Sequence, residues 1–153
     1  MYRSRRALIG VLGVAMGLFG FSVFGQSGAL NVNRRGVAID GYDPVAYFTV
    51  GQAVQGDSSI AVEHEGATYY FASTEHRDLF TADPERYLPE YGGWCAYAMA
   101  SGSFARINPQ AWVIHDGRLF LNFSRRINNR FVGDLEGFIA SADQAWPEAS
   151  RSR

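Results

Sequence analysis

The sequence predicts an α+β domain: a small antiparallel sheet formed by two β-hairpins, with short helices packed on it. Two segments, 60–71 and 113–123, are rich in β-branched and aromatic residues, and each is interrupted by an acidic residue followed by Gly, a pair suited to a tight turn. Ser73 follows the first segment and Ser124 the second, and serine is a favoured residue for capping a helix. Helices packed on paired hairpins are an α+β layer arrangement.

The remaining elements follow from turn and helix signals along the chain. Pro is well placed at the first position of a helix, and pairs of Gly favour turns. The expected order is a turn at 39–44, an apolar run to Phe48, a loop at 51–59, the first hairpin, a helix from Ser73 to Ala82, a helical turn opened by Asp83-Pro84, a short helix after Gly92-Gly93, the second hairpin, and a last helix from about Asp134 to Ala145 that ends before Pro147.

The two hairpin–helix segments also match each other residue by residue. At an offset of 51 they align without a gap, which we interpret as a weak internal duplication. Chance similarity between two ordinary hairpin–helix units is the alternative. Identical pairs include His64 with His115, Gly66 with Gly117, Ser73 with Ser124, Phe80 with Phe131, Asp83 with Asp134, and Glu85 with Glu136. Because both histidines precede a turn, we expect their side chains to be exposed.

Residues 1–25 are typical of a secretory signal peptide. Three arginines among residues 3–6 form a basic region, and the stretch 7–25 has no charged residue. An uncleaved inner-membrane anchor is the alternative, because about 20 apolar residues can span a bilayer. The pair Arg5-Arg6 leaves open whether export uses the general secretory or the twin-arginine route. Either way, we expect a bacterial protein that is periplasmic or otherwise exported.

The rest of the chain is expected to be a linker at 26–36, one domain at 37–147 and a tail at 148–153. Hydrophobic residues make up 47% of the sequence, enough for a real core and against disorder. The formal net charge is −1, and the sequence has no basic stripe of the kind that binds nucleic acid. The membrane is an expected partner only through an uncleaved N-terminal segment.

The single cysteine, Cys95, excludes an internal disulfide. Its thiol is either buried and inert or kept for a purpose. Together with His76 and with Met99, one helical turn after Cys95, it would form a soft ligand set suited to copper or zinc. The alternative for His76 is an ordinary solvated histidine on a helix.

Aromatic residues near Gly92-Gly93 are the candidate lining of a small-ligand site. Tyr47, Trp94 and Tyr97 combine ring surface with a polar group, so they could form a polar-aromatic pocket. The alternative is that they belong to the core, where burial of aromatics contributes strongly to a small domain.

Two stretches, Asp43-Pro44-Val45-Ala46 and 69–87, resemble the YHS domain, a small family often assigned to metal binding. The resemblance covers residues 41–87, and the remainder looks like an exported bacterial branch of that family. It implies thiolate ligands at three positions in cysteine-rich members. Here those positions hold Ala46, Ala72 and His76, so only the last keeps a donor atom.

The sequence therefore predicts an exported, YHS-like, non-catalytic binding domain for a metal ion or small ligand near Cys95. A thiol-dependent redox or catalytic protein that uses Cys95 is the alternative, and an interaction module without a small-molecule site is a third. No phosphate loop, dinucleotide fingerprint or nucleophile elbow is present in the sequence, which favours a role other than catalysis.

Overall fold

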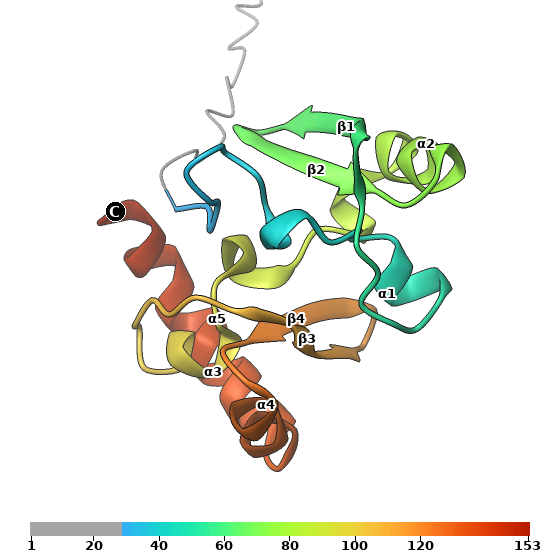
Figure 1. Ribbon diagram of the computed structural model, residues 1–153. Helices are drawn as coiled ribbons and strands as arrows, with labels where there is room; N and C mark the ends of the chain where they lie inside the picture. Colours follow the sequence, from blue (N-terminus) through green and yellow to red (C-terminus); the bar gives the residue numbers. More distant parts are fainter. Residues whose placement is uncertain (1–28) are drawn as a thin grey trace, which may run out of the picture.

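The structure is a computed structural model that describes residues 29–153 (Figure 1). It confirms the α+β class, with two small antiparallel sheets and helices packed around them. The expected signal peptide or anchor, residues 1–25, lies outside the described residues. Within 29–153, no helix combines the length and the apolar character that crossing a membrane requires.

The first half of the domain holds a 3₁₀ segment, a one-turn helix, a hairpin and a capped helix. The elements are η1 (Ile39–Gly41), α1 (Ala46–Thr49), β1 (Asp57–His64), β2 (Ala67–Phe71), α2 (Thr74–Ala82) and η2 (Pro84–Arg86). The second half repeats this order up to the capped helix and then has a long helix in place of a second 3₁₀ segment. Its elements are η3 (Glu90–Gly93), α3 (Ala96–Met99), β3 (Asn108–His115), β4 (Arg118–Asn122), α4 (Arg125–Val132) and α5 (Leu135–Arg151).

The two hairpins form separate two-stranded sheets instead of joining into one. In the described chain β1 pairs with β2 and β3 pairs with β4, both antiparallel, and Figure 1 shows the hairpins in different parts of the molecule. Glu65 and Asp116 open the two hairpin turns with φ of 47° and 49°, each followed by a Gly that also has positive φ. Two successive left-handed residues give the turn whose twist matches a hairpin.

The structural repeat extends beyond the residues that match in sequence. Each long strand has an irregularity at the same place, between positions 57 and 61 in β1 and between 108 and 112 in β3. Ser73 accepts a hydrogen bond from the backbone N–H of residue 76, and Ser124 does the same for residue 127. Consecutive left-handed residues occur at 39–41 and again at 91–93. Both halves therefore share the left-handed segment, the strand irregularity and the serine helix cap, in the same order along the chain.

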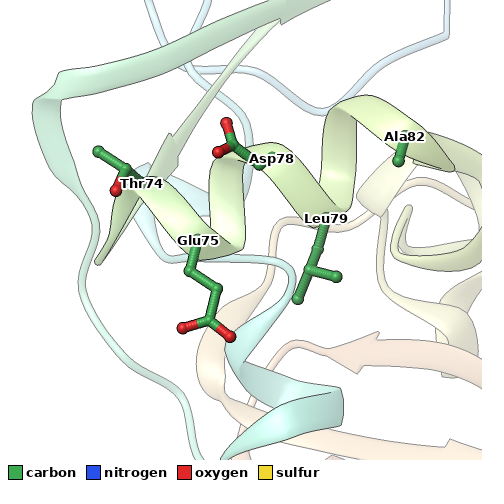
Figure 2. Close-up of a pocket in the computed structure, with 5 residues that line it drawn as sticks. All are labelled: Thr74, Glu75, Asp78, Leu79 and Ala82. Atoms are coloured by element: carbon green, nitrogen blue, oxygen red, sulfur yellow. The ribbon is translucent and has the colours of Figure 1, made fainter.

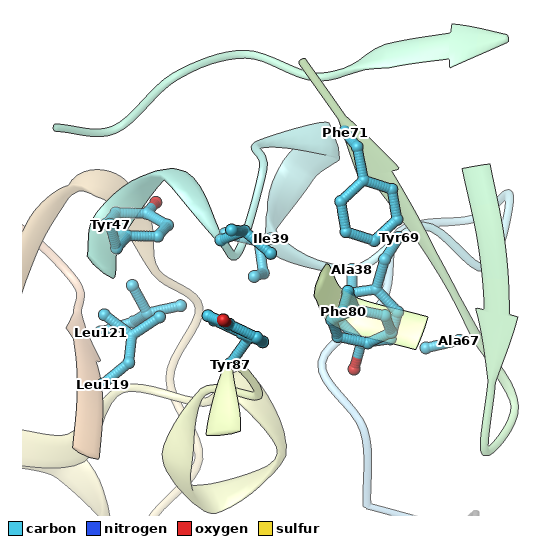
Figure 3. Close-up of a cluster of buried hydrophobic side chains, with 11 residues drawn as sticks. Ala38, Ile39, Tyr47, Ala67, Tyr69, Phe71, Phe80, Tyr87, Leu119 and Leu121 are labelled. Atoms are coloured by element: carbon cyan, nitrogen blue, oxygen red, sulfur yellow. The ribbon is translucent and has the colours of Figure 1, made fainter. Parts of the chain in front are cut away.

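Strand β4 joins the two halves because both of its faces are buried. Leu119 and Leu121 enter a core cluster made mostly by the first half, in which Phe71 and Phe80 are fully buried (Figure 3). Phe120 points to the opposite face and enters a second cluster with α3, α4 and α5. Alternation along a strand explains this division. Fully burying one such side chain contributes about 1.5–3 kcal/mol, so β4 is central to the stability of both clusters.

Two segments differ from the sequence-based expectation. The last helix was expected to end before Pro147, but α5 continues through it to Arg151, so this prediction was wrong. Ala149 and Ser150 are buried, and the packing of these last turns compensates for the backbone N–H that proline lacks. Residues 29–36, expected as part of a linker, contact the domain: the backbone N–H of Asn31 donates to the carbonyl of Gly92 at 2.9 Å.

Candidate functional site

A buried carboxylate lies at the centre of the first half. Asp43 is completely buried and accepts hydrogen bonds on both oxygens. The backbone N–H groups of Val45 and Ala46 donate to Oδ1 at 2.8 and 3.3 Å. The N–H of Ala72 donates to Oδ2 at 2.8 Å. A buried charge needs partners of this kind, since an unpaired one would be very costly.

The fourth partner of Asp43 is an imidazole. Nδ1 of His76 lies 2.6 Å from Oδ2, and the imidazole side chain is 14% exposed. A carboxylate only accepts hydrogen bonds, so the contact assigns the proton of the ring to Nδ1. The sequence-based alternative of a solvated helical histidine therefore does not describe His76. Asp43 fixes both the orientation and the tautomer of the ring.

Local sequence explains how these groups come together. Asp43 stands directly before Pro44, and its side chain accepts from the N–H of Val45, just before α1, and from the N–H of Ala46, the first residue of α1. Ser73 caps α2 by accepting from the N–H of His76, which places the imidazole in the first turn of that helix. The starts of two helices and the end of β2 therefore meet at one carboxylate.

The other ring nitrogen of His76 faces the hydroxyl of Thr49. Oγ1 of Thr49 lies 3.1 Å from Nε2 and also 3.1 Å from the carbonyl oxygen of Val45. The hydroxyl has one proton, so it donates either to the lone pair of Nε2 or to the carbonyl. When it turns to Val45, the Nε2 lone pair of the neutral ring becomes available to a ligand. We call this set the Asp43–His76–Thr49 chain.

The expected soft ligands belong to the second half. Cys95 is 1% exposed, and its Sγ lies 3.6 Å from Oδ1 of Asn122. Met99 follows one turn later, its N–H donating to the carbonyl of Cys95, and its side chain is fully buried in the cluster around Phe120. The hydrogen-bond partners of His76, by contrast, lie in the first half. Buried thiols in apolar surroundings are usually inert.

The three aromatic candidates have separate partners. Tyr47 is buried, stacks edge-on against Trp112 and donates its hydroxyl proton to the carbonyl of Pro109. The indole N–H of Trp94 donates to the carbonyl of Ala29. Tyr97 packs against Phe138, with ring centroids 4.9 Å apart. These contacts correspond to the core alternative considered above.

Burial and charge shift several ionisable groups. Burial raises the pKa of the Tyr47 hydroxyl well above its usual range, with further contributions from Tyr42 and then Asp43. Hydrogen bonds from Arg118 hold the pKa of the Asp143 carboxyl below its usual range, although partial burial opposes the effect. Hydrogen bonds to Glu90 and then to Asp143 raise the pKa of Arg118, which accordingly stays charged at all accessible pH values.

Hollows on the surface formed by residues 29–153 include three near these groups. One of about 450 Å³ runs along the outer side of α2, where Leu79 is partly exposed beside Glu75 and Asp78 (Figure 2). The other two, of about 470 and 330 Å³, lie at the turns of the first and second hairpins. His64 lines the hollow at the first hairpin, and His115 lines the hollow at the second hairpin.

Comparison of the chain with protein-family models, with curated proteins and with solved structures found no match. A function is therefore inferred from the geometry, and the Asp43–His76–Thr49 chain is the group that combines a buried carboxylate with a potential metal ligand. Sequence reasoning selected His76 but not its two partners. The signal for Asp43 was its position before Pro44, which is typical of a helix start. Thr49 gave no signal of its own.

Proposed function

We propose that this protein is an exported, YHS-like binding domain that holds a metal ion through Nε2 of His76. The single observation that carries the proposal is the 2.6 Å contact between Nδ1 of His76 and Asp43. Histidines that bind metals commonly donate their other ring N–H to a carboxylate, which fixes the ring and makes the ligating nitrogen more basic. Imidazole is a suitable ligand for copper and zinc.

The arrangement around Asp43 supports the same location. Positions 46, 72 and 76 are those at which the resemblance to cysteine-rich YHS domains implies thiolates. Here Ala46 and Ala72 contribute backbone N–H groups to the carboxylate, and His76 contributes its imidazole. The three positions converge in space although two of the donor side chains are missing. This convergence favours a metal site in which one protein ligand, the His76 nitrogen, remains where cysteine-rich members have three thiolates.

One nitrogen leaves most coordination positions to water or to an incoming ligand. Structural zinc sites use four protein ligands, whereas open positions are typical of sites where the ion acts or is exchanged. Displacing the Thr49 hydroxyl from Nε2 costs little free energy, because the hydroxyl keeps a hydrogen bond to the carbonyl of Val45 after it leaves the ring. We therefore assign an exchangeable ion, with Cys95 taking no part.

The test is titration of the purified protein with Cu²⁺ and Zn²⁺, followed by calorimetry and elemental analysis. His76→Gln should bind one ion per chain fewer than the native protein. His115→Gln is the matched control, since it removes a half-exposed histidine at the other hairpin, and Cys95→Ala tests the buried thiol. Both should bind as the native protein does. Equal binding by His76→Gln and the native protein would refute the proposal.

A further inference from the structure

The turn of the first hairpin brings together three side chains of types that can ligate a metal ion. His64 ends β1, Glu65 opens the turn, and Glu85 lies in η2. One ring nitrogen of His64 and one carboxylate oxygen of each glutamate lie within 4.8 Å of one another. Among residues 29–153, this is the one group in which three or more His, Cys, Asp or Glu side chains have ligand atoms this close together. We call it the His64–Glu65–Glu85 cluster.

The imidazole of this cluster has an unused nitrogen. Nε2 of His64 is buried and has no hydrogen-bond partner within the described part of the chain, although the side chain as a whole is 24% exposed. The ring is held edge-on against Phe80, with centroids 5.8 Å apart. Leaving a buried polar atom unpaired costs about 1–3 kcal/mol, so such atoms usually have a structural or ligand-binding reason.

Negative charge gathers at the same place. Nε2 of His64 lies 4.0 Å from Oε2 of Glu65. The pKa of the Tyr69 hydroxyl is raised, first by burial and then by the charges of Glu65 and Glu85. The adjoining hollow of about 470 Å³ is lined by Glu63 as well as by the cluster's own Glu65, against one arginine, Arg35. A cation would relieve the repulsion between these carboxylates.

The second hairpin provides an internal comparison. His115, Asp116 and Glu136 occupy the equivalent positions at the offset of 51 and line the hollow of about 330 Å³. That hollow also contains Arg118, whose guanidinium bonds Asp143 at 2.7 Å and Glu90 at 2.9 Å. The first hairpin has Ala67 at the position of Arg118. The second hairpin thus supplies a cation from its own strand β4, whereas the arginine at the first hollow, Arg35, comes from outside the hairpin.

We propose that the His64–Glu65–Glu85 cluster binds a divalent transition-metal ion, of which zinc is the representative. One imidazole and two carboxylates leave a fourth position for water, the open geometry of a zinc site with three protein ligands. Ligand atoms at about 2.0–2.2 Å from zinc lie about 3.4 Å apart in a tetrahedron, so the 4.0 Å separation of Nε2 and Oε2 has to close slightly. Both glutamates are exposed and able to move.

The experiment is calorimetric titration with Zn²⁺ in a buffer that does not bind metals, on protein carrying His76→Gln. This background silences the site proposed for the Asp43–His76–Thr49 chain, so the two proposals succeed or fail separately. We expect one zinc per chain to bind. Adding Glu85→Gln or Glu65→Gln should weaken the affinity at least about tenfold, because loss of even an outer-shell partner of a metal ligand typically has an effect of that size.

Glu136→Gln is the matched control, because it makes the same change at the equivalent position of the second half and should alter the affinity by less than about twofold. Circular dichroism should show all variants folded, since the three substituted glutamates are exposed and a glutamine at position 76 keeps an N–H donor for Asp43. Absence of a bound zinc in the His76→Gln protein, or equal weakening by Glu85→Gln and Glu136→Gln, would overturn the assignment.

Discussion

Oδ2 of Asp43 lies 2.6 Å from Nδ1 of His76, and through this contact the start of α1 is tied to the first turn of α2, 33 residues later in the chain. The same oxygen accepts from the N–H of Ala72, just after β2. The carboxylate is therefore both the support of the candidate ligand and a junction of three elements.

Asp43→Asn should lower the free energy of unfolding by about 3 kcal/mol, because an amide can satisfy only some of these donors and sets an N–H₂ group against the others. Denaturation by urea measures the change. Asp57→Asn is the control and should cost less than about 0.5 kcal/mol. Asp57 is exposed and accepts from the N–H of Ser59, a role that Asn108 fulfils with its amide oxygen at the matched position. Similar losses in both variants would contradict the assigned role of Asp43.

Thr49→Val tests whether the hydroxyl competes for the imidazole. If Thr49 only occupies Nε2 until a ligand arrives, its removal should strengthen Cu²⁺ or Zn²⁺ binding at His76 about two- to fivefold, the equivalent of one modest hydrogen bond. Calorimetry in parallel with the native protein provides the comparison. A weaker affinity in Thr49→Val would instead make the hydroxyl a ligand of the ion.

The local elements were predictable from sequence because their signals are local. The two hairpins, the caps at Ser73 and Ser124 and the α+β class all follow from residues within one turn or strand of each other. Separation of the hairpins into two sheets was not predictable in this way. It depends on β4 burying both faces, which is a property of tertiary packing.

The candidate site was predictable only in part, for a related reason. His76 was identified as a donor, but its partners Asp43 and Thr49 lie about 30 residues earlier and become neighbours only after folding. Cys95 and Met99 have the helical spacing expected of a ligand pair, yet that spacing does not determine whether their side chains face a site or the core. Both side chains are buried.

Arg118→Gln should destabilise the protein by about 1 kcal/mol at neutral pH, a discounted value because Arg118 and its partners are partly exposed. Its hydrogen bonds keep the pKa of Asp143 below 3.8, so their stabilisation is present above that pH and is lost as pH falls through the lower folded-state pKa. Urea denaturation from pH 7 to pH 2.5 should show the difference between native and variant shrinking below about pH 4. A difference that stays constant over this range would contradict the ion-pair account.

Pro147→Ala should raise the free energy of unfolding by about 1–2 kcal/mol. Proline inside a helix removes one backbone hydrogen bond and crowds the carbonyl four residues earlier, and alanine restores the first and relieves the second. Thermal and urea denaturation measure the gain, with circular dichroism confirming unchanged helix content. A loss of stability would mean that the ring itself makes packing contacts that the helix requires.

We propose that Asp43 holds the proton on Nδ1 of His76 and leaves Nε2 for a metal ion. NMR of the ¹⁵N-labelled imidazole groups during titration with Zn²⁺ observes both nitrogens, with His76→Gln used to assign the signals. We expect Nδ1 of His76 to be protonated before and after zinc is added, and only its Nε2 resonance to shift markedly. A protonated Nε2 on a neutral ring, or a His76 spectrum that zinc leaves unchanged, would contradict it.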